Sequence, residues 1–252
     1  MNNRSYKLEA LVLSSFVYRD SDRIVNLFSR ERGRQSALAK GALKPKNSLR
    51  GLCQPPRYCR LEMAKSRGSL DILAQGELVE AYLDIHNDLL KIAYSGYIAE
   101  LILAGMPEQK PQEEVFFLAL AAFTLLEMGQ NPSLALNLFQ LRFLKALGFT
   151  PKLDQCSVCG RRVEGSSFYL SPRRGGLVCA SCYGATEGLI CAGTVKTMAL
   201  LLKIDLPRLA GFKTSELIQT EMGHALDEYL EYHLDYHAKA KIFLRQLLGE
   251  IE

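Results

Sequence analysis

Two Cys-x-x-Cys pairs constrain the fold of this chain more than any other feature of its sequence. The first pair is Cys156 and Cys159, the second is Cys179 and Cys182, and nineteen residues separate the two pairs. Each pair can occupy one edge of a tetrahedral zinc ion through its thiolates, so this spacing predicts a four-thiolate site. Four protein ligands leave no open position for water or substrate. We therefore expect one structural Zn²⁺ per chain, which stabilises a short insertion that has little core of its own.

The other cysteines and the redox setting leave alternatives open. The four paired cysteines could be ordinary buried thiols, and Cys191 could replace one of them as a ligand, although it breaks the pairing. Cys53 and Cys59 are expected to pack as small apolar side chains. The sequence shows neither a signal peptide nor about 18 uncharged apolar residues in a row. We therefore expect no membrane partner and a cytoplasmic location, where cysteines more often bind metal than form disulfides.

A change of hydrophobic period near residue 80 predicts an α+β fold with more than one domain. Before it, short apolar runs with a turn at Gly33 predict strands, and a further hairpin turns around Ser66–Gly68. Residues 40–56 are rich in Gly, Pro, Lys and Arg and are expected to form a mobile loop. Five short strands with one long basic loop predict a closed OB-fold β-barrel at residues 1–80, a fold that binds single strands across an exposed face.

Beyond this change the apolar residues recur at helical spacing. Two of the expected helices open at or near a proline, Pro111 and Pro132. The helical pattern resumes after the cysteine pairs and ends in a long amphipathic stretch from Ser215 to Leu248. We therefore expect an α-helical domain at residues 81–252, with the four-cysteine zinc finger inserted at about residues 150–190.

The positive charge of the chain gathers in the predicted barrel. Residues 1–80 hold fifteen Lys and Arg against eight Asp and Glu, and Arg30 to Arg67 hold eleven against two. Such a one-sided basic surface favours a polyanion partner, although it could also be a solvated face that only aids solubility. The predicted phosphate contacts are Arg30, Arg34, Lys40, Lys44, Lys46 and Arg50.

Aromatic residues in the barrel could add base stacking if they face outward. The candidates are Phe16, Tyr18, Phe28 and Tyr58, and the alternative is that they fill the barrel core, which we favour for Phe28. The four arginines of the cysteine segment could extend the basic surface or be solvated turn residues; they are Arg161, Arg162, Arg173 and Arg174.

No pattern in the sequence predicts an enzyme. The chain has no Walker A loop, no dinucleotide-binding glycine motif, no nucleophile elbow and no defensible pair of catalytic carboxylates. His233 and His237 stand at the i, i+4 spacing that can bind a metal, but the neighbouring tyrosines make a helix–helix contact the better interpretation.

Four separated segments resemble the bacterial RecO family of DNA repair proteins, in the order found in that family. They are "SALAKGALKPKNSLRGLCQPP", "LGFTPKLDQCSVCG", "SPRRGGLVCASC" and "YLEYHL…FLRQL", and the resemblance covers nearly the whole chain. It implies an OB-fold that binds single- and double-stranded DNA, a helical domain and a zinc-finger insertion with the cysteines at 156, 159, 179 and 182.

The resemblance also implies a role in DNA recombination after DNA damage, on the nucleoid. Such a protein is a mediator that anneals complementary strands, works with RecR and helps RecA load onto DNA coated by the single-stranded DNA-binding protein SSB. The SSB tail is acidic with apolar terminal residues, so its receptor needs an apolar groove bordered by cations. The candidates for that border are Arg142, Lys145, Lys241 and Arg245.

Two functions from other classes remain as alternatives. One is an RNA-binding OB-fold and zinc-ribbon module, since charge and barrel do not tell DNA from RNA without contacts to the 2′-hydroxyl. The other is a zinc-stabilised protein-interaction module in which the basic loop is incidental. Comparing the affinity for one strand made as DNA and as RNA distinguishes the DNA-binding function from the first alternative. A negligible affinity for nucleic acid at low salt would favour the second.

Overall fold

The computed structural model describes residues 5–184, 188–205 and 212–250 of the chain. It consists of two compact units, one formed by residues 1–127 with 238–252 and the other by residues 128–237. Residues 185–187 of the expected zinc-finger insertion lie outside the described part. Within the described part, no helix combines the length and the apolar character needed to cross a membrane. The expected boundary between a barrel domain at residues 1–80 and a helical domain at residues 81–252 stays a prediction.

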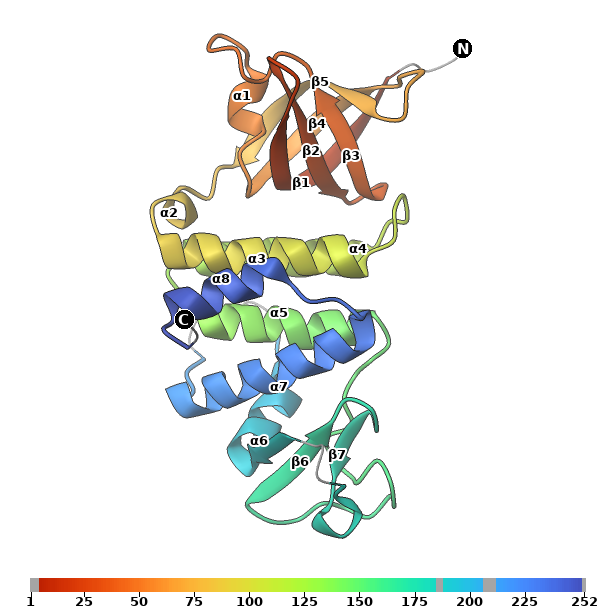
Figure 1. The fold of residues 1–252 in the computed structure, drawn as a ribbon, viewed down its shortest axis with the longest axis vertical. Helices are drawn as coiled ribbons and strands as arrows, with labels where there is room; N and C mark the ends of the chain where they lie inside the picture. Colours follow the sequence, from red (N-terminus) through yellow and green to blue (C-terminus); the bar gives the residue numbers. More distant parts are fainter. Residues whose placement is uncertain (1–4, 185–187, 206–211, 251–252) are drawn as a thin grey trace. The chain divides into compact units, whose positions relative to one another are not determined.

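The first unit begins with a closed five-stranded barrel (Figure 1). Around the barrel the strand order is β1-β2-β3-β5-β4. Neighbouring strands are antiparallel except for β3 and β5, which are parallel at Ala37–Asp71 and Leu38–Ile72. This is the Greek-key order of an OB-fold, so the predicted fold is confirmed. The strands are β1 (Ser5–Tyr18), β2 (Asp22–Ser29), β3 (Gly33–Ala39), β4 (Arg57–Ala64) and β5 (Asp71–Glu80).

The barrel interior is filled by the alternate residues of each strand, as the two-residue period of a strand requires. Small side chains such as Ala10, Ala37 and Ala39 lie beside larger ones such as Leu61 and Met63, and all are buried. Cys53 and Cys59 belong to the same buried cluster, in agreement with their expected role as small apolar residues.

The basic loop between β3 and β4 is more regular than its composition predicts. It contains the short helix α1 (Leu49–Leu52), whose two leucines are buried in the barrel core. The backbone N–H of Leu43 donates to the carbonyl of Ser21 at 2.9 Å, and that of Gly41 donates to the Asp22 carboxylate at 2.7 Å. Composition did not predict this regular structure, because the buried residues of the loop follow neither the helical nor the strand period.

In addition to α1, the described residues of the first unit form four helices: α2 (Leu83–His86), α3 (Leu89–Gly105), α4 (Glu113–Glu127) and α8 (Lys239–Leu247). Asp88 is the N-cap of α3, because its side chain accepts from the backbone N–H groups of Leu90 and Lys91. Phe116 of α4 packs against barrel residues Phe28 and Tyr58, with ring centroids 6.3 and 6.1 Å apart.

α8 is held against α3 by its N-terminus. The Glu100 carboxylate of α3 accepts hydrogen bonds from the backbone N–H groups of Lys239 and Ala240, at 3.0 and 2.6 Å. This carboxylate satisfies two of the free N–H groups at the start of the helix and lies at the positive end of its dipole.

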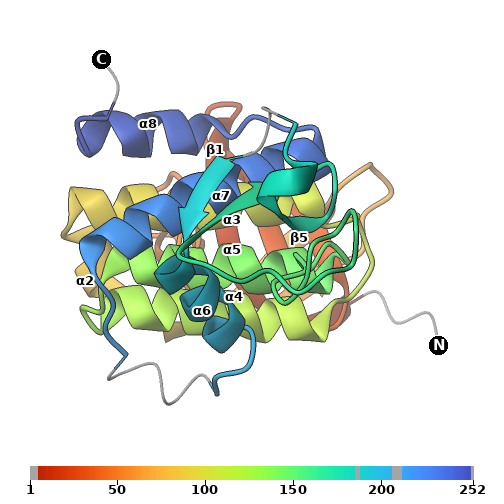
Figure 2. The same ribbon diagram turned by 90° about the horizontal axis from the view of Figure 1, so that it is seen from below.

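In its described residues, the second unit combines three α-helices with a three-stranded antiparallel sheet of order β7-β6-β8. α7 packs along α5 and also contacts α6 (Figure 2). Asn137 and Gln140 of α5 donate to the Gln219 carbonyl and the Asp227 carboxylate of α7. The elements are α5 (Pro132–Ala146), β6 (Ser167–Ser171), β7 (Gly176–Val178), η1 (Ala180–Cys182), β8 (Gly188–Cys191), α6 (Ala192–Leu201) and α7 (Glu216–Leu234).

The long amphipathic stretch expected at the C-terminus is divided into α7 and α8. Asp235 follows α7 in the left-handed conformation, with φ of 48°, and this ends the helix. The amphipathic pattern alone did not reveal the break, because apolar residues continue at helical spacing on both sides of it.

Gly33 is required by a close approach of two backbones in the first unit. Its φ is +69°, and a Cβ added there would lie 2.0 Å from the carbonyl oxygen of Lys110. We therefore expect Gly33→Ala to lower the free energy of unfolding by more than the roughly 1–2 kcal/mol that a left-handed alanine costs alone. Urea unfolding measures this.

Gly129→Ala is the matched control, since Gly129 has φ of +72° with open space where the Cβ would lie. This variant should lower the free energy of unfolding only by the roughly 1–2 kcal/mol that a left-handed alanine costs. Equal losses for the two variants would contradict the close approach at Gly33.

Candidate metal centre and nucleic-acid interface

The four paired cysteines converge on one point in the second unit. Their Sγ atoms all lie within 4.8 Å of one another, and Sγ of Cys159 is 3.8 Å from Sγ of Cys179. Two thiolates bound to one tetrahedral zinc at about 2.3 Å each are roughly 3.8 Å apart, so the spacing fits the ion. The group could hold a metal ion, as the sequence predicted.

Backbone hydrogen bonds hold the two cysteine pairs in place. The N–H of Cys156 donates to the carbonyl of Arg161 at 2.8 Å, and the N–H of Gly160 donates to the carbonyl of Cys156 at 2.9 Å. Gly160 has φ of +72°, a conformation that glycine adopts readily in so tight a turn. The second pair follows β7, where the N–H of Cys182 donates to the carbonyl of Cys179 at 2.9 Å.

The local hydrogen bonds also favour ionised sulfur in the first pair. Burial opposes ionisation of Cys156, but N–H donors from Cys159, Cys179 and Val158 outweigh it and lower the pKa of the thiol to about 6. The Arg161 side chain lowers the pKa of Cys159. Hydrogen bonding to Cys179 raises the pKa of Cys182 to about 12. A divalent cation supplies the positive charge that all four thiolates need.

Cys191 has a different role from the four clustered cysteines. It is the N-cap of α6, where its sulfur accepts from the N–H of Thr194 at 3.4 Å. The Glu221 carboxylate accepts from the backbone N–H of Cys191 at 3.0 Å. Its thiol thus satisfies a helix end, and the metal-binding group of the described residues does not include it.

The six predicted phosphate contacts divide into two sets. Arg30 and Arg34 already have acidic or carbonyl partners within the first unit. Arg30 forms an ion pair with Glu113 at 2.5 Å, which raises the pKa of its guanidinium. Arg34 donates to the carbonyl of Leu103 at 2.5 Å and lies 3.3 Å from Glu108. These partners stand about 70–80 residues away in the sequence, so local patterns could not reveal them.

The second set is Lys40, Lys44, Lys46 and Arg50, and all four are exposed. They belong to the loop between β3 and β4 and to α1. Within the described ranges, none of the four forms an ion pair with a carboxylate. The charges of these four residues are therefore available to a polyanion. Arg30 and Arg34 could bind a polyanion only by giving up their existing partners.

The turn of the β1–β2 hairpin lies beside this loop, because Ser21 and Asp22 accept hydrogen bonds from Leu43 and Gly41. Near the turn Phe16 is 49% exposed and Tyr18 is 37% exposed, and the guanidinium of Arg19 lies 5.1 Å from the centroid of the Tyr18 ring.

Phe28 and Tyr58 lie away from this surface. Phe28 is fully buried, as expected, and Tyr58 packs on Phe116. Two of the four aromatic candidates can therefore meet a base, and the other two support the contact between barrel and helix.

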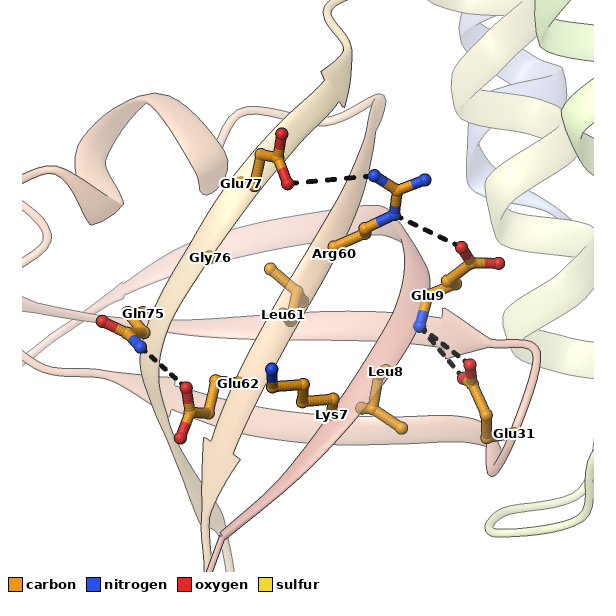
Figure 3. A pocket seen from close by; sticks show the side chains of 10 residues that line it. All are labelled: Lys7, Leu8, Glu9, Glu31, Arg60, Leu61, Glu62, Gln75, Gly76 and Glu77. Atoms are coloured by element: carbon orange, nitrogen blue, oxygen red, sulfur yellow. Dashed lines mark hydrogen bonds and ion pairs between the residues drawn. The ribbon is translucent and has the colours of Figure 1, made fainter.

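A second face of the barrel is acidic. A groove of 450 Å³ crosses β1, β4 and β5, and its charged lining comes from Lys7, Glu9, Glu31, Arg60, Glu62 and Glu77 (Figure 3). Arg60 pairs with Glu9 at 3.4 Å and with Glu77 at 3.9 Å, so little positive charge remains for a phosphate. The sequence count showed the excess of basic residues in the barrel but not this segregation, because the acids come from separate segments.

His233 of α7 and His237, three residues beyond the end of that helix, belong to no metal-binding group among the described residues. The His233 ring stacks on Phe149 with centroids 4.2 Å apart, and burial lowers the pKa of the imidazole. His237 lies 3.7 Å from Glu231. The ring contacts of His233 are packing contacts, but the ring stacked on it belongs to Phe149, in the segment after α5, so the expected helix–helix contact stays a prediction.

The four residues proposed to border a tail-binding groove occur in both units. In the second unit, Arg142 donates to the carbonyls of Leu201 and Ile204, and Lys145 is exposed. In the first unit, Arg245 of α8 pairs with Glu250 at 3.0 Å. Lys241 precedes the exposed apolar residues Ile242 and Phe243 on α8.

Taken together, the fold and the site define an OB-fold protein with an inserted four-cysteine metal-binding motif. The family model described as "Recombination protein O N terminal" matches residues 1–82, and "Recombination protein O C terminal" matches residues 86–241. The chain belongs to the RecO family.

Several curated relatives share the family name. The "DNA repair protein RecO" of Pelotomaculum thermopropionicum is 35% identical over 95% of this chain and 93% of that protein. The relative from Desulforamulus reducens is 33% identical over 96% and 94% of the two chains, and that from Bacillus subtilis is 31% identical over 96% and 94%. The resemblance found in the sequence is therefore confirmed.

The contacts of Arg34 predict a structural contribution that Lys44 does not make. Arg34→Gln removes charged hydrogen bonds to Leu103 and Glu108, so we expect it to lower the free energy of unfolding by about 1–2 kcal/mol. Lys44→Gln removes an exposed charge and should change it by less than about 0.5 kcal/mol. Equal values in urea unfolding would contradict this division of the basic residues.

Proposed function

We propose that this protein binds DNA through the exposed basic loop of its barrel and acts as a recombination mediator in DNA repair. The observation that carries this proposal is the juxtaposition of Lys40, Lys44, Lys46 and Arg50 with the exposed rings of the β1–β2 hairpin. Cations neutralise phosphates and aromatic rings stack on bases, which together suit a single strand. Arg30 and Arg34 stay predicted contacts, weakened by their ion pairs.

Strand annealing fits the same surface. A protein that anneals must hold a strand by its phosphates and leave the base edges free to pair. Flexible lysines meet this requirement, because they contact the backbone without reading the bases. The protein would then bring two strands together without nucleotide hydrolysis, as a mediator rather than an enzyme, on DNA of the nucleoid in the cytoplasm.

The family also supports protein partners, namely RecR, the SSB tail and, indirectly, RecA. We propose that the acidic SSB tail docks on helix surfaces where apolar residues and cations adjoin. α8 offers this combination, since Lys241 and Arg245 flank Ile242, which is exposed. Lys145 is the exposed cation of α5, whereas Arg142 is engaged with carbonyls at the end of α6. A tail bound there would raise the local concentration of the barrel around the coated strand.

We further propose that the cysteine group binds one structural Zn²⁺ per chain. Cys156, Cys159, Cys179 and Cys182 would hold the ion, and four thiolates leave it no position for a substrate. Its contribution is to fix the segment between the two pairs, which has only short strands.

Neutralising two loop lysines tests DNA binding. We expect Lys44→Gln with Lys46→Gln to weaken single-strand binding and to reduce the slope of log K against log salt by about 1.4, at about 0.7 per lost contact. Fluorescence anisotropy with a labelled oligonucleotide measures both quantities. The same variant should anneal SSB-coated complementary strands more slowly.

Lys196→Gln with Lys203→Gln is the matched control, because it removes the same charge from exposed positions of the second unit. An unaltered slope in the loop variant, with the protein folded, would show that DNA binds elsewhere. Tighter binding of the same strand as RNA would favour an RNA-binding module instead.

Metal analysis tests the zinc proposal. The purified chain should contain one equivalent of zinc, and Cys179→Ser should lose metal and stability together, since metal affinity in such a site is folding energy. Cys191→Ser is the control and should keep its zinc, because this cysteine caps α6. Zinc-free protein whose four clustered thiols react freely under native conditions would refute the site.

A further inference from the structure

A pocket of 370 Å³ in the first unit lies beside the start of β2, α1 and α2. Its ionisable and polar lining comes from Arg23, Arg50, Cys53, Gln54 and His86. These residues stand in three separate segments of the sequence, so the pocket could not be recognised before the fold was known. Arg50 connects it to the basic loop described above.

The pocket is lined by positive charge without a compensating carboxylate. Arg23 and Arg50 are its charged residues, and no Asp or Glu lines it in the described part of the chain. The Cys53 thiol is buried, and burial raises its pKa to about 11 despite the charge of Arg23, so it adds no negative charge at pH 7. The nearby Asp22 carboxylate accepts from the Gly41 N–H and the Ser21 hydroxyl.

The nitrogen-bearing side chains of the pocket are held in place to different degrees. Arg23 donates from Nε to the Ser15 hydroxyl at 2.6 Å and from Nη2 to the Ser15 carbonyl at 3.3 Å, which fixes the guanidinium and leaves it further N–H donors. Arg50 is exposed, so its long side chain has room to change rotamer and meet a ligand. His86 lies 3.3 Å from the Pro56 carbonyl, and burial with the charge of Arg57 lowers the pKa of its imidazole.

We propose that this pocket binds the terminal phosphate monoester of a DNA strand, so that the protein prefers phosphorylated strand ends. The inference rests on the proposed DNA binding and deepens it by naming a subsite for the chain end. A phosphate monoester has up to two negative charges and three acceptor oxygens at pH 7. Two guanidinium groups match this ligand in charge and in hydrogen-bond geometry.

The position of the pocket favours a strand end over a free phosphate compound. Lys40 and Lys44 belong to the loop whose residues Ala42 and Leu43 form part of the pocket wall. A strand whose first phosphate enters the pocket can therefore place its next phosphates on the exposed lysines. An internal phosphate has one negative charge and nucleotides on both sides, so it fits a concave site less well.

Binding of three labelled oligonucleotides of one sequence tests the proposal. They carry a 5′-phosphate, a 3′-phosphate or hydroxyl groups at both ends, and the full chain is used in 0.1 M salt. We expect at least one phosphorylated strand to bind about tenfold more tightly than the hydroxyl strand. Inorganic phosphate, compared with chloride at equal ionic strength, should weaken binding of the phosphorylated strand and spare the hydroxyl strand.

Two variants locate the effect in the pocket. Arg50→Gln removes one cation, and Gln54→Glu adds a carboxylate while keeping an oxygen for the hydrogen bond from Arg57. Both should bring the affinity ratio of phosphorylated to hydroxyl strand close to one. Arg67→Gln, an exposed arginine of the β4–β5 turn outside the pocket, is the matched control and should keep the ratio.

The outcomes separate this inference from the function on which it rests. Equal affinity of the wild-type chain for all three strands overturns the end-binding pocket and leaves DNA binding intact. A preference that survives in both Arg50→Gln and Gln54→Glu places the recognition elsewhere and also overturns it. Absence of affinity for every strand would instead refute the proposed DNA binding.

Discussion

Closure of the barrel by β1 is the interaction on which the rest of the first unit depends. This strand pairs with β4 through residues 5–12 and with β2 through residues 10–18, so one segment joins both ends of the sheet. Its register shifts between Val12 and Ser14, and such a bulge lets a strand bend sharply enough to serve two neighbours. Beyond the bend, β1 and β2 continue as the hairpin that carries the exposed aromatic residues.

The barrel separates charges of opposite sign onto different faces. The acids around Arg60 lie in the groove over β1, β4 and β5, whereas the exposed lysines follow β3. Two other arginines already have acidic partners, because Arg30 pairs with Glu113 of α4 and Arg34 pairs with Glu108 of the connection between α3 and α4. The functional consequence is orientation, since a polyanion is attracted to one side of the barrel and repelled from another.

The sequence predicted what depends on local period and on cysteine spacing. Strands, the helix starts near Pro111 and Pro132 and the convergence of four thiols all follow from short-range patterns. Contacts between distant segments could not be found this way. The ion pairs of Arg30 and Arg34, the helix-capping role of Cys191 and the cationic pocket all depend on which elements the fold brings together.

The break between α7 and α8 marks a second limit of pattern reasoning. The left-handed conformation of Asp235 has no signature in the sequence, because the amphipathic spacing continues across this residue. The helix that follows it, α8, nevertheless belongs to the other compact unit. The left-handed residue thus lies just before the point at which the chain leaves the second unit for the first.

That membership has a consequence for the order in which the protein is made. The ribosome synthesises residues 1–127 first, then the whole second unit, and only afterwards α8, which belongs with the first unit. Until α8 emerges, the Glu100 carboxylate lacks the helix N-terminus that it caps, and α3 lacks one of the helices that pack against it. The nascent barrel and its first helices must therefore persist in an unfinished form while all of the second unit, with its cysteines, is translated.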